Sequence, residues 1–140
     1  MNYQEKTILI ALPLDFIIFG AYSIWLIPQL LNEGMESIDY RGPVILALVA
    51  SVLLTIISQI LLASFNHKQA NLEDVRDKEI RRRATGYTLV FLAAPYLVGL
   101  ILAIAEADYF YIVHVMLFGG VLADIVTSLA QLRFYRKGIN

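Results

Sequence analysis

Hydrophobic residues fill four long stretches of the chain, and polar residues are concentrated between them. The stretches run from about Thr7 to Leu31, Pro43 to Phe65, Ala84 to Ala105 and Tyr109 to Leu132. Each is within or close to the roughly 17–25 residues that a helix needs to span the hydrocarbon core of a bilayer. The pattern therefore predicts an all-α fold, an antiparallel four-helix bundle of membrane-spanning helices. Because four spans use most of the 140 residues, we expect one transmembrane domain over residues 1–140.

The connections between these stretches differ in length and in charge. The connection around Glu106–Asp108 has only a few residues, and a turn that short joins helices that lie side by side, so spans three and four are predicted to form a hairpin. Residues 32–42 are typical of a solvated turn, and residues 66–83 of a charged loop. Within this loop Asn71 can cap a helix that continues into span three, with Asp74 three residues later.

Composition agrees with a membrane protein. Hydrophobic residues make up 59% of the chain and charged residues 16%, and the mean hydropathy of +0.66 lies outside the usual range for a soluble domain of this size. The lipid bilayer is therefore the first expected partner. The absence of cysteine excludes disulfides, thiol redox catalysis and thiolate metal sites.

Basic residues are distributed very unevenly. Arg41 stands alone between the first two spans, and the other ten are Lys6, Lys68, Arg76, Lys78, Arg81, Arg82, Arg83, Arg133, Arg136 and Lys137. Lys and Arg near the ends of membrane spans stay on the cytoplasmic side, which predicts that both termini and the central loop are cytoplasmic. Acidic residues interleave with the bases of that loop, so we expect no nucleic acid as a partner.

Two aspartates interrupt the apolar stretches, Asp15 in the first and Asp124 in the last. Each lies nine residues inside a flanking cation, Lys6 or Arg133, and therefore roughly 13 Å along its helix. A charged group near the centre of a span costs roughly 3 kcal/mol or more, so it must face protein or water. The two acids are predicted to lie at one depth, and they form the centre of a candidate site for a proton, a cation or a ligand.

Polar residues recur at helical spacing beside these acids. Span four continues from Asp124 to Thr127 and Ser128, span two contributes Gln59, and span three contributes Thr88. If these stripes converge on the bundle axis, they surround the acids in a small polar cavity. Two carboxylates that face each other in a low dielectric do not both ionise readily, so they would share a proton or hold a cation. In the alternative interpretation each acid is satisfied separately and only holds helices together.

Other chemistry has little support. His114, in the outer part of span four, lies roughly 15 Å along the helix from Asp124, too far for the two to bind one metal ion, and we expect it to anchor the helix at the membrane interface. No His, Asp and Glu cluster has metal-ligand spacing, and no serine stands in a nucleophile motif. We therefore expect no enzyme activity, no metal and no cofactor.

Two segments resemble a known family. Leu72–Ala84 reads LEDVRDKEIRRRA, and Leu122–Gly138 contains LADIV followed by QLRFYRKG. Both are similar to segments of small prokaryotic four-span membrane proteins of the DUF2178 type, although Val75 and Phe134 replace the usual Glu and Tyr. The resemblance implies a multi-pass protein of the prokaryotic inner membrane and supplies no catalytic residues. Such proteins are often encoded beside small helix-turn-helix regulators, which implies sensing or sequestration.

Three functions fit these features. The first is a regulatory or sensory protein, in which the acid pair changes helix packing and the charged segment before span three reports the change to a cytoplasmic regulatory protein. The residues expected to contact that partner are Asp74, Arg76, Asp77 and Arg81. The second is a proton- or cation-coupled transporter of small solutes, and the third is a structural accessory subunit. Gly119 and Gly120 permit close helix contact, so pairing into a homodimer is a further expectation.

Overall fold

The computed structural model describes residues 3–65 and 74–138, and within those ranges it contains four long α-helices, one short 3-10 helix and no strand. The elements are α1 (Tyr3–Asn32), η1 (Met35–Ser37), α2 (Arg41–Phe65), α4 (Val75–Ile104) and α5 (Tyr109–Lys137). All four long helices are long and apolar enough to cross a membrane. The predicted all-helical class and the four long apolar helices are thus confirmed. The first part of the predicted central loop, with its expected cap Asn71, lies outside the described residues.

Aspartates begin both helices of the second half. The Asp74 carboxylate accepts a hydrogen bond from the Val75 amide at 2.6 Å, and the Asp77 carboxylate accepts one from the Asp74 amide at 3.3 Å. The two acids form a capping box, which satisfies amides that have no partner within the helix. Asp108 caps α5 by accepting from the Phe110 amide at 2.7 Å. α4 therefore starts well before its apolar stretch, at a cap three residues later than the predicted one.

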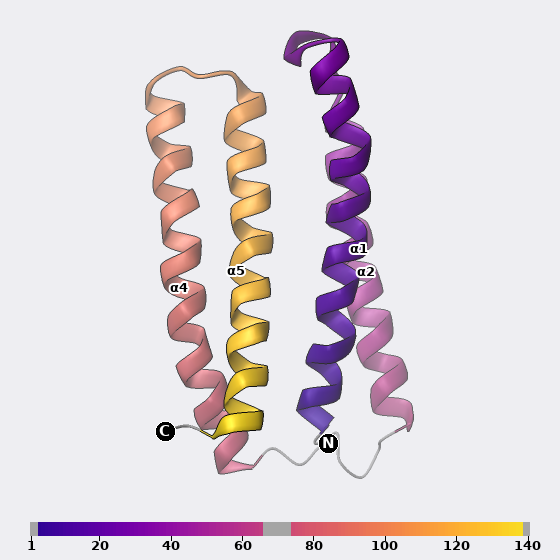
Figure 1. The fold of residues 1–140 in the computed structure, drawn as a ribbon, viewed down its shortest axis with the longest axis vertical. Coiled ribbons are helices and arrows are strands. Elements are labelled where there is room, and N and C mark those ends of the chain that lie inside the picture. Colours follow the sequence, from indigo (N-terminus) through magenta and orange to yellow (C-terminus); the bar gives the residue numbers. More distant parts are fainter. Residues whose placement is uncertain (1–2, 66–73, 139–140) are drawn as a thin grey trace.

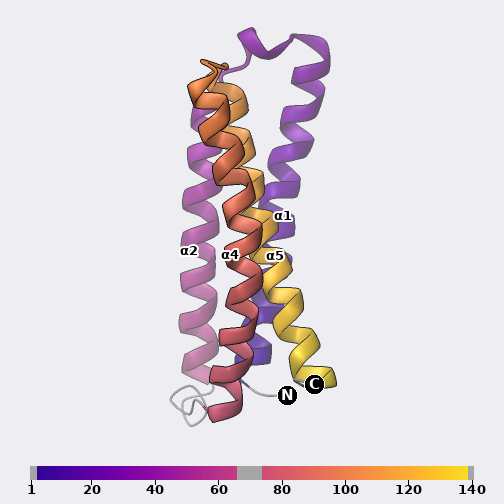
Figure 2. The same cartoon turned by 90° about the vertical axis from the view of Figure 1, so that its left-hand side faces the viewer.

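The helices form two antiparallel hairpins, α1 with α2 and α4 with α5 (Figure 1). The contact between α4 and α5 is the most extensive, as predicted for these neighbours, and the contact between α1 and α5 joins the two hairpins. α2 has an extensive contact only with α1, so its polar residues do not join those of α4 and α5 on one common axis. Both termini lie at one end, which we call the N/C end, and the turns after α1 and α4 lie at the other, the hairpin end (Figure 1 and Figure 2).

Glycines allow α4 and α5 to approach closely. A Cβ atom added at Gly119 would lie 2.1 Å from Cβ and 2.4 Å from Cγ of Pro95, and one added at Gly99 would lie 3.2 Å from Cγ of Met116. The proline ring of α4 therefore occupies space that only a glycine leaves free. A Cβ at Gly120, by contrast, meets no atom within 4 Å. Of the two glycines expected to support pairing with a second copy, Gly119 is already engaged within the chain.

The main cluster of buried apolar residues lies in the half of the molecule nearer the hairpin end, and further buried residues, such as Ile80 and Ala84, lie nearer the N/C end. One cluster joins α1, α2, α5 and the turn after α1, and its members are Phe19, Tyr22, Leu26, Ile38, Val44, Ala47, Phe110 and Leu117. Toward the N/C end, α2 and α4 expose long apolar faces, for example at Ile57 and Leu89. Such faces suit contact with lipid, whose hydrocarbon is as apolar as the side chains. The contact between α1 and α5 thus has an apolar part near the hairpin end and a polar part near the N/C end.

Candidate functional site

Asp15 and Asp124 meet at the contact between α1 and α5. Their carboxyl groups lie close enough to interact, with Asp15 half-buried and Asp124 exposed at the surface of the bundle. Two neighbouring carboxyl groups form a hydrogen bond when one of them carries a proton, which it donates to an oxygen of the other. The arrangement therefore provides two neighbouring carboxyl groups that can share one proton, within helices that are apolar enough to span a bilayer.

Two threonines link α5 to α4 one turn from Asp124. The hydroxyl oxygens of Thr88 and Thr127 lie 2.6 Å apart, and the Thr127 hydroxyl donates to the Ala123 carbonyl, also at 2.6 Å. The Thr88 hydroxyl lies 3.4 Å from the Ala84 carbonyl of its own helix, so either threonine can be the donor of the bond between the two helices. This bond connects α5 to α4 one turn from Asp124.

Of the remaining residues of the predicted polar cavity, Ser128 follows Asp124 by one turn of α5, whereas Gln59 lies apart from the acids. Ser128 is buried on α5, with 9% of its surface exposed. Gln59 is exposed on α2, and no described contact joins it to either aspartate. The polar residues that recur along α2 instead form, in part, hydrogen bonds within that helix, since the Ser58 hydroxyl donates to the Thr55 carbonyl at 2.8 Å. The acids are thus grouped with Thr127 and Thr88, and not with Gln59.

A second polar centre, which the sequence did not indicate, lies at the N/C end. The Asp77 side chain is only 3% exposed, and its carboxylate accepts a hydrogen bond from the Tyr135 hydroxyl at 3.0 Å. Burial, and then this bond to Asp77, raise the pKa of Tyr135 above its usual range. Gln4 of α1 and Gln131 of α5 line a cavity of about 30 Å3 beside the pair, which is enough for one water molecule. α1, α4 and α5 therefore meet around one buried carboxylate.

The residues expected to contact a cytoplasmic partner are divided by this arrangement. Asp77 is buried and bonded to α5, so its carboxylate cannot reach a partner in this arrangement. Asp74, Arg76 and Arg81 are exposed. Arg76 donates to the Tyr135 carbonyl at 3.2 Å, which ties the start of α4 to the end of α5. The exposed members of the set are those that can still meet another protein.

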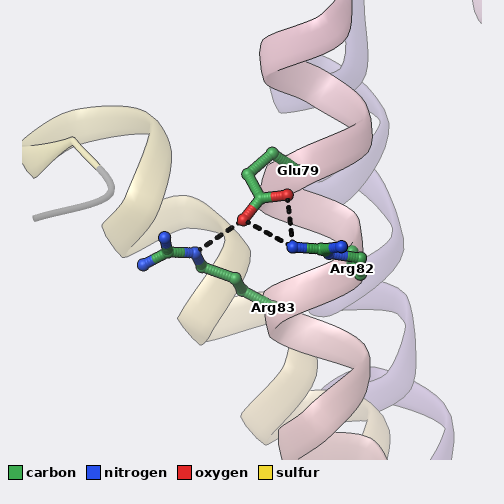
Figure 3. A network of polar contacts seen from close by, with 3 residues as sticks. All are labelled: Glu79, Arg82 and Arg83. Atoms are coloured by element: carbon green, nitrogen blue, oxygen red, sulfur yellow. Dashed lines mark hydrogen bonds and ion pairs between the residues drawn. The ribbon is translucent and has the colours of Figure 1, made fainter.

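One turn further along α4, a glutamate holds two arginines at the surface. Glu79 forms ion pairs with Arg83 at 2.9 Å and with Arg82 at 3.1 Å (Figure 3). The hydrogen bond from Arg83, together with the charge of Arg82, holds the pKa of the Glu79 carboxyl below its usual range. The pair with Arg83 has the four-residue spacing that favours a helix. This network stabilises the first turns of α4, which precede its apolar stretch.

His114 is buried between the helices near the hairpin end, with 9% of its surface exposed, and its predicted role as an interfacial anchor stays a prediction. Its Nδ1 atom lies 2.6 Å from the Phe110 carbonyl, and its Nε2 atom lies 2.7 Å from the Tyr22 hydroxyl. A carbonyl only accepts, so Nδ1 carries the proton and Nε2 accepts from Tyr22. The rings of Phe110 and Tyr40 pack against the imidazole at 4.0 and 5.3 Å. The hydrogen-bonded side chains of Tyr22 and His114 thus form a buried link between α1 and α5.

Comparisons with known proteins add no family to these observations. No protein-family model matches the chain, and the comparisons with curated proteins and with solved structures give no match. The resemblance to four-span proteins of the DUF2178 type therefore stays a prediction. Within residues 3–65 and 74–138, no group of three or more His, Cys, Asp or Glu side chains could hold a metal ion.

Proposed function

We propose that this protein is a small, non-enzymatic regulatory or sensory protein of the prokaryotic inner membrane. In this proposal its four helices span the bilayer, and both termini are cytoplasmic. The neighbouring carboxyl groups of Asp15 and Asp124 are the responsive site, which binds a proton or exchanges that proton for a cation. The exposed charged residues at the start of α4 would then contact a cytoplasmic regulatory protein.

The observation that carries this proposal is the close approach of the two carboxyl groups at the contact between α1 and α5. When the shared proton leaves, two negative charges face each other across the contact of α1 and α5. Like charges at this distance repel strongly in a low dielectric. The helices must then separate, or a cation must replace the proton. Either change alters the packing of α5, which is what a sensor requires.

A route from the acids to the charged end of α4 supports the regulatory interpretation. Thr127 follows Asp124 by one turn and is bonded to Thr88 of α4. From there α4 continues as one helix to Val75, beside the bond between Asp77 and Tyr135. A helix is a rigid element over this length, so a displacement at Thr88 moves the charged end as well. The exposed arginines Arg76 and Arg81 lie on the part that moves.

The packing of the hairpin end favours sensing over transport. On that side of the acids, α1 and α5 are joined by Phe19, Tyr22 and Leu117 of the buried cluster. On the other side lie Ser128, Gln131 and the small cavity beside Asp77. A proton that arrives from the N/C end therefore finds polar neighbours, but one that continues outward meets a packed apolar seal. A transporter would have to open this seal in every cycle.

The test is a pH titration of the protein in nanodiscs, followed by infrared difference spectroscopy of the carboxyl groups. We expect the titration of Asp124 to shift in Asp15→Asn, and that of Asp15 to shift in Asp124→Asn, because each acid controls the other. Asp39→Asn, which removes an exposed loop acid, is the matched control and should leave both titrations in place. Two titrations that do not respond to the partner's replacement would refute the proposal and favour a structural role.

The conformational part is tested by amide hydrogen exchange across the same pH range. Exchange at residues 75–83 should change as the pair titrates in wild type and in Asp39→Asn, and this change should disappear in Asp124→Asn. Repeating the titration in sodium salt and in a salt of a large organic cation separates proton binding from cation binding. Coupled transport is the alternative. Proton flux into proteoliposomes that requires both acids would favour it over sensing.

A further inference from the structure

A long apolar groove lies along the hairpin of α1 and α2. Its volume is about 640 Å3, and small residues of both helices leave the space between them. These small residues are Ala21, Gly42, Ala47 and Ala50, and the walls include Ile17, Leu46 and Trp25. The hydroxyl of Tyr22, which also lines the groove, donates to His114 and so is not available to a bound molecule. The groove thus presents almost only hydrocarbon.

The shape of the groove fits an extended hydrocarbon chain. The lining residues run from Ile17 to Trp25 on α1 and from Gly42 to Ala50 on α2. Eight residues of helix correspond to about 12 Å, so the groove is narrow and parallel to the helices. In a membrane-spanning hairpin this direction is also that of the lipid acyl chains.

A separate polar pocket lies beside the groove at the hairpin end. Its volume is about 330 Å3, and its charged lining consists of Glu36, Asp39, Arg41 and Asp108. Consecutive residues line the two hollows, since Arg41 faces the pocket and Gly42 and Pro43 face the groove. Arg41 is also the only Lys or Arg between Lys6 and Lys68 in the sequence. One guanidinium and three carboxylates therefore stand at the mouth of a hydrocarbon groove.

We propose that the groove and the polar pocket together bind a phospholipid with an ethanolamine headgroup. One acyl chain lies in the groove, the phosphate binds Arg41, and the ammonium binds the three carboxylates. Guanidinium binds phosphate through paired hydrogen bonds, and a primary ammonium donates three hydrogen bonds to carboxylates. A choline headgroup has no N–H to donate. A purely anionic headgroup would meet three carboxylates with no cation of its own.

The same charges disfavour a second copy of the chain as the occupant. A twofold interface brings the same surface of both subunits together. Around this mouth it would oppose six carboxylates with two arginines, because each copy contributes Glu36, Asp39, Asp108 and Arg41. The inference rests on the membrane insertion proposed above, and it is independent of the acid pair of Asp15 and Asp124.

Trp25 reports on the groove directly. It is the only tryptophan of the chain, it lines the groove, and 37% of its surface is exposed. The protein is reconstituted in phosphatidylcholine vesicles that contain a small, fixed fraction of lipid with brominated acyl chains, which quench tryptophan. The brominated lipid carries an ethanolamine, a choline or a glycerol headgroup. We expect the ethanolamine lipid to bind the site roughly tenfold more tightly than the choline lipid, because only the ethanolamine ammonium donates hydrogen bonds to the carboxylates.

Two variants and one control test the geometry. Ala50→Leu fills the groove and should abolish the preference, and Arg41→Gln should reduce it. Ala94→Leu places the same side chain at an exposed alanine of α4, away from the groove, and should retain it. Equal quenching by all three headgroups, or a preference that survives Ala50→Leu, would overturn the proposal. Protection of Trp25 from every brominated lipid would also overturn it, and would indicate a second copy.

Failure of membrane insertion is visible in the same experiment. If the helices do not span the bilayer, aqueous iodide quenches Trp25 and brominated chains do not, which overturns this inference together with its premise. The infrared titration of the acid pair uses other residues and another signal. Loss of the lipid preference with a coupled acid pair therefore refutes only the lipid site.

Discussion

Replacing Gly119 by alanine tests the packing of the α4–α5 hairpin more sharply than any other single change. The added methyl carbon would lie 2.1 Å from Cβ and 2.4 Å from Cγ of Pro95, whereas ordinary contact begins at 3.4 Å. Pro95 is a rigid ring in the middle of α4, so it cannot rotate away. The backbones of α4 and α5 must therefore separate by roughly 1 Å, and overpacking of this kind costs about 1–3 kcal/mol.

Gly120 provides the matched control one residue away. A methyl group there meets no atom within 4 Å. It should therefore bring only the gain in helix propensity of alanine over glycine, at most about 1 kcal/mol. Gly119→Ala gains the same propensity and loses the close contact. We therefore expect Gly119→Ala to be less stable than wild type by about 1–2 kcal/mol, and Gly120→Ala to be as stable as wild type or more so.

The assay is reversible unfolding of the purified protein in mixed micelles with increasing mole fraction of denaturing detergent, followed by circular dichroism. The difference between the two variants at one mole fraction is the decisive quantity, because micelle effects are common to both. Equal stability of Gly119→Ala and Gly120→Ala would refute the close packing of Pro95 on Gly119. A loss in both variants would show instead that glycine at these positions serves some purpose other than helix contact.

Three further changes test the other contacts. Tyr135→Phe removes the hydroxyl that donates to the buried Asp77 carboxylate, so we expect a loss of about 1–3 kcal/mol and faster amide exchange at the start of α4; unchanged exchange would contradict this link. Tyr22→Phe leaves Nε2 of His114 without its donor, and should cost about 1–2 kcal/mol in the same unfolding assay. If replacing His114 lowered the stability of wild type and of Tyr22→Phe by the same amount, the assigned tautomer would be refuted. Asp74→Ala removes one half of the capping box and should cost about 0.5–2 kcal/mol, with exchange faster only in the first turn of α4; an effect spread over the whole helix would speak against a local cap.

The sequence was sufficient for features that depend on position along the chain. Four apolar stretches gave the four helices, and the short connection around Glu106 gave the close pair of α4 and α5. The common level of Asp15 and Asp124 along their helices followed from helical rise alone. The ion pair of Glu79 with Arg83 likewise has the four-residue spacing that a helix brings together.

Features that depend on how each helix is rotated could not be predicted. Gln59 lies in a stripe of polar residues, yet it is exposed, because α2 contacts α1 and hardly any other helix. Asp77 stands in a segment that is charged on all sides, so no periodicity marks it as buried. Its partner Tyr135 is 58 residues away in the sequence. The burial of His114 could not be predicted from its own surroundings in the sequence either, because its partner Tyr22 lies on another helix.

The apolar seal between the acid pair and the hairpin end has an electrical consequence. With the proposed orientation, a proton reaches Asp15 and Asp124 from the cytoplasm through roughly 13 Å of a hydrocarbon layer that is about 30 Å thick, and it cannot continue outward through Phe19 and Leu117. The proton therefore crosses almost half of the transmembrane field each time it binds or leaves. A full charge crossing the whole field changes in free energy by about 2.3 kcal/mol per 100 mV. The proton affinity of the pair would then change about fivefold for every 100 mV, which makes the site responsive to membrane potential as well as to cytoplasmic pH.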